Sequence, residues 1–330
     1  MDDRFPTIAQ ALHDRGYRTG GFVANTFWLG RGFGIDRGFE WYQDYAEISV
    51  ATVLDSWWLS QQVRRTIRLR RGDYRMTDRL TAADIRGRFL SWIDRDDRRP
   101  FFAFLNVFDA HEPYYPPGDF GFPFARRAAP VYHWNFNRAV AHAPEELTDL
   151  RDSYDSCIRY LDAQLEALVK ALDTRGLMRN TIIIVTADHG ETIGDHENTL
   201  IGHENSVYFD VLQVPLVIYV PSRTGGTRVN APVSLADVPH TIVDLVSGSR
   251  ARNPFPGRTV VPSDAQKHAR RAGGRHGSHA PHRFPSQPGQ VPPEHPPVAD
   301  SRRPALLRRG GPLALRGRCQ GARAAVRPGE

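Results

Sequence analysis

Acidic and imidazole side chains that could bind a metal or a charged ester gather in residues 181–204, TIIIVTADHGETIGDHENTLIGHE. Asp188, His189 and Gly190 follow directly after an apolar run, and His203 comes later in the same loop. Carboxylates and imidazoles at loop tips are usual protein ligands of divalent metals. The residue types therefore indicate a polar functional site in this loop.

The apolar run before these residues, 181–187, lacks polar alternation and predicts a strand buried on both faces. In an open α/β sheet, functional groups gather outside the carboxyl ends of the strands. Asp and Gly after a strand are also ordinary turn residues, and an isolated Asp-His-Gly fits that interpretation as well. Two further histidines in the same short loop, His196 and His203, favour a site.

A second set of polar residues follows another apolar run, FFAFLNVF at 101–108. This run predicts a second buried strand. Asp109, His111 and Glu112 come just past its end. His111 alone would be interpreted as a turn histidine before proline. Because it follows a strand end, as the first loop does, we expect it to belong to the same site.

The hydrophobic periodicity predicts the elements that position these groups. We expect helices over 7–15, 77–93 and 145–174, and a strand over 17–25. An edge segment and a further buried strand are expected within 207–220. The packing face of the long helix is predicted to comprise Tyr154, Ile158, Leu161, Leu165, Leu168 and Leu172. The irregular segment 115–144 is expected to shape access to the site.

Several of these segments together resemble the sulfatases of the alkaline-phosphatase superfamily. The resemblance rests on the strand that ends in Asp188-His189-Gly190, on His203, and on the Val-Pro-Leu strand at 214–216. TIAQALHDRGYRT at 7–19 and the His-x-Pro-Tyr around His111 extend it, although Glu40 replaces the usual aspartate of a Gly-Phe-Asp segment. The resemblance implies a three-layer αβα fold with a mostly parallel, alkaline-phosphatase-like sheet, here incomplete.

By this resemblance, Asp188 and His189 are metal ligands, and His203 and His111 are catalytic residues that bind ester oxygens or protonate the leaving group. The implied metal is calcium, with manganese or zinc as alternatives because His189 stands where the family often has asparagine. The implied substrate is a sulfated small molecule or glycan, and the implied reaction is sulfate-ester hydrolysis.

The family's nucleophile, a Cys or Ser in C/S-x-P-x-R, has no counterpart in residues 1–330, and neither do two further aspartate ligands. Two ligands are too few, since zinc takes roughly four and calcium roughly six to eight. We therefore expect this chain alone to be inactive or nearly so. A phosphodiesterase or phosphonate-ester hydrolase of the same superfamily, and a non-catalytic gene fragment, are the alternatives.

The chain divides by composition into a sulfatase-like part, residues 1–262, and a tail, residues 263–330. The tail carries 13 Lys plus Arg against 4 Asp plus Glu and is rich in Arg, Pro, Gly and Ala. Such a segment cannot bury enough apolar surface to fold, so we expect disorder. The composition also fits a GC-rich gene read out of frame, and a basic nucleic-acid-binding tail is the alternative.

The remaining composition excludes several function classes. Only two cysteines occur, Cys157 and Cys319, so no disulfide framework or cysteine-rich zinc site is expected. Outside the tail the chain is slightly acidic, which gives no reason to expect nucleic-acid binding, and the Arg-rich segment 64–75 is interpreted as a solvated helix face. No run of about 18 apolar residues predicts a membrane span, and no signal peptide is visible. Localisation and oligomeric state stay open.

Overall fold

The computed structural model describes residues 5–26, 28–44, 80–95, 97–117, 120–125, 142–196, 201–203, 207–221, 226–247 and 252–261. The Arg-rich segment 64–75, most of the irregular segment 115–144 and the predicted tail 263–330 lie outside these residues. The expectations for them, and for a domain boundary after residue 262, therefore stay predictions. Within the described part, no helix is long and apolar enough to cross a membrane.

A parallel three-stranded sheet lies at the centre of the described fold, in the order β2 (Trp41–Gln43), β1 (Arg18–Val23) and β3 (Phe101–Asn106). All six residues of β1 are buried, as expected for a central strand covered on both faces. The strands predicted over 17–25 and 101–108 are thereby confirmed. The middle strand β1 pairs with β3 from Arg18 to Val23 and with β2 from Gly20 to Phe22.

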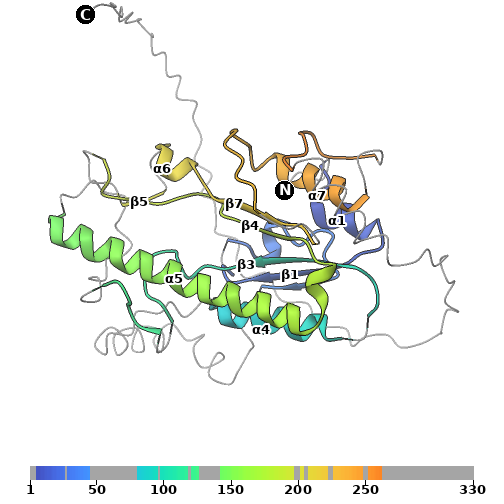
Figure 1. The fold of residues 1–330 in the computed structure, drawn as a ribbon, viewed down its shortest axis with the longest axis horizontal. Helices are drawn as coiled ribbons and strands as arrows, with labels where there is room; N and C mark the ends of the chain where they lie inside the picture. The colour runs from blue at the N-terminus through green and yellow to red at the C-terminus, as the bar shows by residue number, and fades with distance from the viewer. Residues whose placement is uncertain are drawn as a thin grey trace, which may run out of the picture. The chain divides into compact units, whose positions relative to one another are not determined.

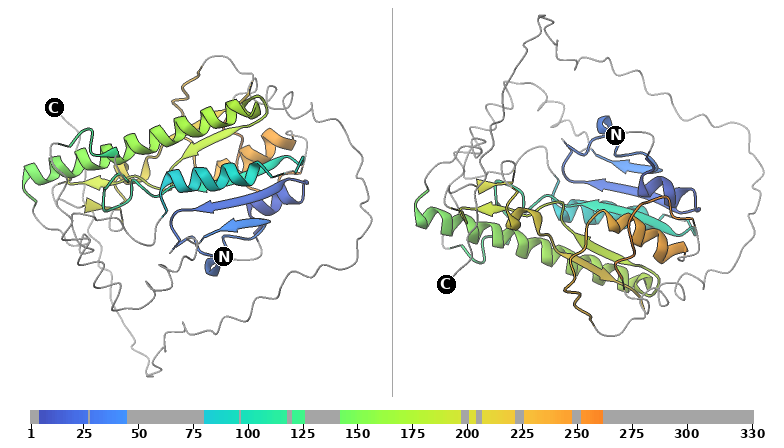
Figure 2. Two further views of the ribbon diagram at one scale, coloured as in Figure 1. Left: turned by 90° about the horizontal axis from the view of Figure 1, so that it is seen from below. Right: turned by 90° about the horizontal axis from the view of Figure 1, so that it is seen from above.

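Helices cover both faces of this sheet, as the α/β class requires (Figure 1). On one face lie α4 (Ala82–Ile93) and the long α5 (Pro144–Thr174), and on the other lie α1 (Ile8–His13) and α7 (Asp237–Ser247). The two views of Figure 2 show the same layers from below and above. The core between β1 and α4 is aromatic and includes Phe22, Ile85, Phe89 and Trp92.

Side-chain caps decide where two of these helices begin. Thr7 caps α1, and Thr81 caps α4 by accepting a hydrogen bond from the Asp84 backbone N–H while the Asp84 carboxylate accepts from the Thr81 N–H. The predicted start of the second helix at residue 77 is therefore wrong, because Thr81 has extended backbone and the helix starts at Ala82. At the C-terminal end of α5, Gly176 adopts a left-handed conformation (φ 67°), which agrees with its prediction as the residue that ends this helix.

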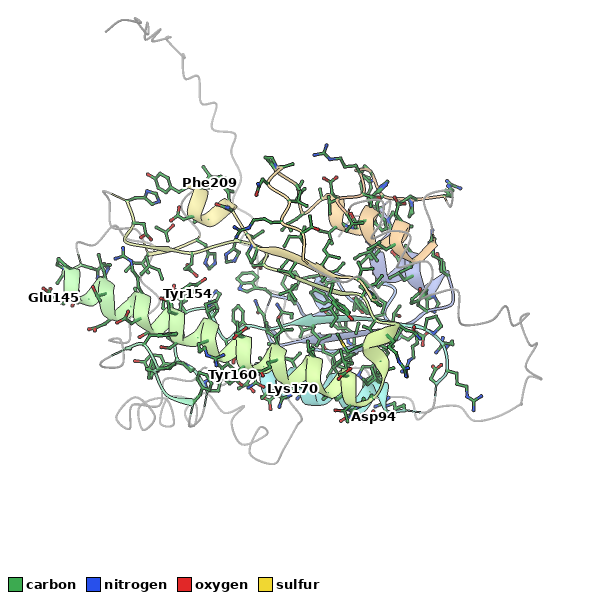
Figure 3. All side chains as sticks on the ribbon, viewed as in Figure 1. Asp94, Glu145, Tyr154, Tyr160, Lys170 and Phe209 are labelled. Atoms are coloured by element: carbon green, nitrogen blue, oxygen red, sulfur yellow. The ribbon has the colours of Figure 1, made fainter. Side chains whose placement is uncertain are left out.

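The long helix α5 buries only part of the predicted face: Leu172 is buried as predicted, and Tyr154 and Leu168 are partly buried against the core. Its buried residues include Leu147, Leu150, Cys157 and Tyr160, whereas Ile158 is 42% exposed. The helix runs from the sheet to the loops beyond it, with Glu145 and Lys170 towards opposite ends in Figure 3. Its two halves contact different neighbours: Leu172 packs in the core below β1, and Leu147 packs with Ile193 and Ile201.

The strand that precedes the candidate site, β4 (Ile183–Thr186), pairs antiparallel with β7 (Leu216–Tyr219). Both strands were predicted to be fully buried, and this is wrong: β4 is half-buried, and β7 alternates between half-buried and exposed residues. Among the described residues β4 has one strand neighbour only, and Val217 of β7 is 59% exposed. Phe104 of β3 is likewise 38% exposed, so this predicted buried strand is also only partly covered.

The remaining elements are short. They are β5 (Thr192–Ile193), β6 (Ile201–Gly202), α6 (Phe209–Leu212) and the 3-10 turns η1 (Arg31–Phe33) and η3 (Leu177–Arg179). The edge segment expected before the Val-Pro-Leu strand is instead the helical turn α6, which buries Val211 and leaves Phe209, labelled in Figure 3, 73% exposed. One buried residue on one side is the pattern of a helical turn, whereas a strand would alternate.

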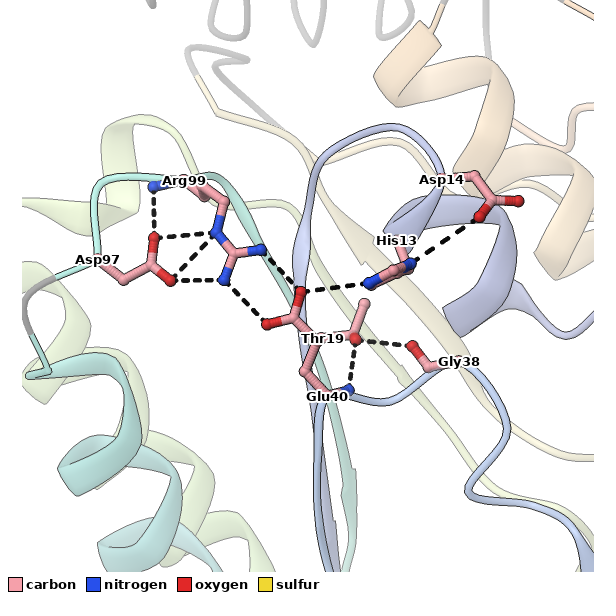
Figure 4. Close-up of polar contacts among 7 residues, drawn as sticks. All are labelled: His13, Asp14, Thr19, Gly38, Glu40, Asp97 and Arg99. Carbon is pink, nitrogen blue, oxygen red and sulfur yellow. Dashed lines mark hydrogen bonds and ion pairs between the residues drawn. The ribbon is translucent and has the colours of Figure 1, made fainter. Parts of the chain in front are cut away.

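A polar cluster fixes the ends of the sheet away from the candidate site (Figure 4). The Arg99 guanidinium pairs with both carboxylate oxygens of Glu40, at 2.7 and 2.9 Å, and with Asp97 at 2.7 Å. Thr19 donates to the Gly38 carbonyl and accepts from the Glu40 N–H. Glu40, the residue that departs from the family pattern, therefore joins the β2 end of the sheet to the turn before β3.

Candidate active site

Asp188 and His189 follow the C-terminal end of β4. The His189 backbone N–H donates to Asp188 Oδ1 at 3.1 Å, and His189 Nδ1 lies 2.8 Å from the Gly190 carbonyl oxygen. A carbonyl can only accept, so Nδ1 carries the ring proton and Nε2 is the basic nitrogen. That Nε2 lies 3.8 Å from Asp188 Oδ1, and the Asp188 side chain is 87% exposed.

Gly190 lets the chain pass close to the segment that contains α6. Its N–H donates to the Val211 carbonyl at 2.7 Å, and a Cβ at this position would lie 1.9 Å from the Asp210 carbonyl oxygen. No side chain fits there. The absence of a Cβ therefore determines how closely the His189 loop approaches α6.

A short antiparallel hairpin, β5 with β6, returns the chain to His189. The register pairs Thr192 with Gly202, so Glu191 and His203 lie opposite each other at the open end of the hairpin. Glu191 Oε1 is 3.1 Å from His203 Nδ1. The hairpin thus places His203, which follows His189 by fourteen residues in the sequence, beside the end of β4.

Three imidazoles meet at this point. The His189 and His203 rings stack with centroids 3.9 Å apart and planes 24° from parallel. His111, from the segment after β3, meets the His203 ring edge to face at 5.3 Å and also contacts Phe108 at 4.2 Å. The structure therefore brings together the three histidines predicted to bind metal or ester, from two strand ends and one hairpin.

The surroundings of Glu191 are buried and aromatic. Its side chain is 6% exposed, and Tyr114, beside it, is 3% exposed. Burial and then the negative charge of Glu191 raise the pKa of Tyr114 well above its usual value, and the same two causes raise the pKa of Tyr154. The hairpin side of the site is therefore dry, whereas the Asp188 side is open to solvent.

Comparison with known proteins decides the family of this chain, because the family model described as Sulfatase matches residues 2–249. The chain belongs to the sulfatase family. Arylsulfatase K of Bos taurus is 30% identical over 122 residues, which are 37% of this chain and 22% of that protein. Iduronate 2-sulfatase of Mus musculus is 43% identical over 103 residues, 30% of this chain and 18% of that protein. The matched regions thus span about a fifth of the length of these relatives.

A solved structure is similar at lower identity. The phosphonate monoester hydrolase of Agrobacterium radiobacter is 20% identical, with a TM-score of 0.45, over 66% of this chain and 53% of that one. The resemblance to sulfatases expected from the sequence is confirmed by the family match. The α/β class with a parallel sheet is confirmed by the fold described above.

Enzymes of the sulfatase and alkaline-phosphatase superfamily generally depend on divalent metals, so we tested how well these residues fit one. Two donors that share a metal at about 2.0–2.5 Å lie roughly 3–4 Å apart, and Asp188 Oδ1 and His189 Nε2 meet this condition. The described residues include no group of three or more side chains that could hold a metal. The pair fits part of a coordination shell.

His196, the other histidine of the sulfatase loop, has a different partner. Its Nε2 lies 3.0 Å from Asp210 Oδ1, and its ring stacks on Tyr208 at 3.6 Å. Burial raises the pKa of Asp210, but the hydrogen bonds to His196, the backbone and Thr192, together with the charge of His196, outweigh burial and lower the pKa. His196 therefore joins the loop to α6.

Two other polar residues have structural contacts. Asp109, which follows β3, is buried and accepts a hydrogen bond from the Ala82 N–H at the start of α4. His240 of α7 lies 2.9 Å from the Phe255 carbonyl and 3.5 Å from the Asp244 carboxylate. These contacts give His240 a structural role at the end of the fold that holds α7.

Glu191 is the residue of this site that the sequence interpretation missed. In the sequence it is one of several acidic residues in the loop that follows residue 187. The signal that could have found it is the hairpin itself, because Glu191 and His203 flank the two short strands that pair when the loop folds back. Without the register, nothing distinguishes Glu191 from the other acids of the loop.

Proposed function

We propose that this chain carries the metal-binding and ester-binding part of a sulfatase active site, which hydrolyses a sulfate ester with a divalent metal. The observation that carries the proposal is the convergence of His111, His189 and His203 beside Asp188. Two of these residues come from the loop after β4 and one from the segment after β3. His111, from a separate segment, meets the His203 ring edge to face, so the contact joins the two strand ends at one point.

Each residue has a role that its position supports. Asp188 and His189 would hold the metal, which when bound neutralises the charge of the ester oxygens. His203 and His111 lie beside His189 and would bind the ester oxygens or donate a proton to the leaving oxygen. The open Asp188 side supplies the approach for the ester, since its carboxylate is exposed.

The substrate is proposed at the level of class only. The names of the two relatives refer to an aryl sulfate and to a 2-sulfated iduronate, so they support sulfated small molecules and sulfated sugars alike. Calcium is the proposed metal, with manganese or zinc as alternatives. The exposed carboxylate suits a hard cation such as calcium, and the imidazole also suits zinc.

The sequence contains no C/S-x-P-x-R nucleophile motif, so we propose that the chain as it stands turns over sulfate esters slowly or not at all. A phosphodiesterase or phosphonate-ester hydrolase would share the metal pair and differ in the nucleophile. A non-catalytic chain would retain the fold alone.

Calorimetric titration of the 330-residue chain with calcium, manganese and zinc tests the metal pair. We expect binding weaker than micromolar that is lost in Asp188→Ala and in His189→Ala, with Asp195→Ala as a control from the same loop. Binding that both site variants leave unchanged would contradict the assignment of Asp188 and His189.

Turnover is measured in parallel with an aryl sulfate, an aryl phosphonate monoester and an aryl phosphodiester. We expect no hydrolysis of any of them above that of the Asp188→Ala variant. Efficient hydrolysis of the sulfate by the native chain would overturn the proposed lack of a nucleophile. Preferential hydrolysis of the phosphonate or the phosphodiester would favour the alternative activity.

A further inference from the structure

The Glu191 carboxylate is placed behind the imidazole of His203 by the backbone. The antiparallel register of β5 and β6 sets the two residues opposite each other, and Gly202, which precedes His203, has φ 104°. A residue with a side chain rarely adopts this conformation, so a glycine is suited to the turn of the chain before His203. The contact between Glu191 Oε1 and His203 Nδ1 is 3.1 Å.

Burial protects the contact between Glu191 and His203 from solvent. The Glu191 side chain is 6% exposed and that of His203 is 18% exposed, so solvent competes little for the hydrogen bond. A buried carboxylate needs hydrogen-bond donors, and His203 Nδ1 can supply one. The Tyr114 hydroxyl is also buried beside Glu191.

A carboxylate at Nδ1 determines which nitrogen of His203 carries the proton. An ionised carboxylate only accepts, so Nδ1 must be the donor, and Nε2 becomes the basic nitrogen of the neutral ring. Free imidazole side chains in water prefer the other tautomer. The contact also fixes the ring plane, which lies 24° from that of His189.

We propose that Glu191 is a positioning residue, which holds the proton of His203 on Nδ1 and so directs Nε2 to the ester. The role given to Nε2 rests on the proposed function. The assignment of the proton to Nδ1 does not depend on it. The residue acts through His203, as a second residue that orients a catalytic histidine does in other hydrolases.

Nitrogen-15 NMR of the histidine rings in the full chain tests the proposal without substrate or metal. The spectrum is recorded well above the ordinary imidazole pKa of about 6.5, where the rings are neutral and their tautomers can be distinguished. The variant His203→Asn identifies the signal among the 13 histidines. We expect the native His203 to carry its proton on Nδ1.

Glu191→Gln removes the charge and keeps the shape. We expect the ratio of the Nδ1–H to the Nε2–H form of His203 to fall by roughly fivefold to tenfold, because charged hydrogen bonds are about twice as strong as neutral ones. Glu191→Asp retains the carboxylate and should remain closer to the native ratio. Glu166→Gln, which changes an exposed glutamate of α5, should leave the ratio unchanged.

A native His203 with its proton on Nε2 would overturn the proposal, whatever the variants do. An unchanged ratio in a folded Glu191→Gln variant would overturn it as well, and the backbone amide spectrum shows whether the variant is folded. Failure of metal binding at Asp188 would count against the proposed function alone, because the tautomer is measured on the metal-free chain.

Discussion

Gly190 shows how one residue without a side chain can determine the geometry of a site. It lies between His189, which stacks on His203, and Glu191, which contacts the same ring. Its N–H donates to the Val211 carbonyl, and the Asp210 carbonyl occupies the space of a Cβ. The loop and α6 are therefore in backbone contact at the centre of the candidate site.

Gly190→Ala should destabilise the protein by about 1–3 kcal/mol, because the new Cβ would lie 1.9 Å from a backbone oxygen and one of the two segments must move. The matched control is Gly87→Ala on the exposed side of α4, where a Cβ meets nothing within 4 Å. That change should stabilise by about 0.5–1 kcal/mol, since alanine is the better helix residue. Urea unfolding measures both, and equal stabilities for the two variants would contradict the close approach.

At the residue scale, much of the candidate site could be predicted from the sequence. Asp188, His189 and His111 follow recognisable strands, and a position at a strand end is visible in the hydrophobic pattern. Glu191 could not be predicted, because its role depends on a two-residue register across a hairpin. Whether Asp188 and His189 bind a metal stays a prediction.

The strand β2 is anchored by Tyr42, whose role belongs to the element scale. Tyr42 is 4% exposed, and its hydroxyl donates to the Leu29 carbonyl at 2.7 Å. Burial, with smaller contributions from Asp44 and Asp36, raises its pKa from 10.0 to about 12. The neutral phenol thus holds the segment before η1 against the sheet edge.

The raised pKa of Tyr42 predicts a pH dependence of stability. A folded-state pKa above the unfolded value gives a contribution that is fully present below pH 10 and is lost as the pH rises towards about 12. Tyr42→Phe should cost about 1 kcal/mol at pH 8 through the lost hydrogen bond, and should make the decline between about pH 10 and 12 shallower by up to about 2 kcal/mol. Urea unfolding across this range measures the slope. An unchanged slope in the variant would show that Tyr42 is not the group that titrates.

Elements were predictable where one local signal dominates and not where tertiary partners decide. The helices α1 and α5 follow from helical periodicity with clear ends, and the strand β3 follows from a continuous apolar run. The start of α4 was missed because Thr81, and not Thr77, is the residue whose side chain caps this helix. The burial of β4 and β7 was overestimated. An apolar run predicts that a strand forms, but it does not predict how many neighbouring strands cover it.

At the scale of the whole molecule, membership of the sulfatase family and the α/β sheet agree with each other. Two strands end near one point, and the loops that follow them carry all of the candidate site. The proposed activity depends on this convergence more than on any one motif. The division into residues 1–262 and a basic tail rests on composition alone and stays a prediction.

The most direct test of the site is histidine-selective NMR of the full chain during addition of manganese, whose unpaired electrons broaden nearby signals. We predict that the ring signals of His189, His203 and His111 broaden first, that those of His196 and His240 persist longer, and that Asp188→Ala removes the preference. Broadening that begins at other histidines, or a native pattern in the Asp188→Ala variant, would contradict a metal site at the end of β4.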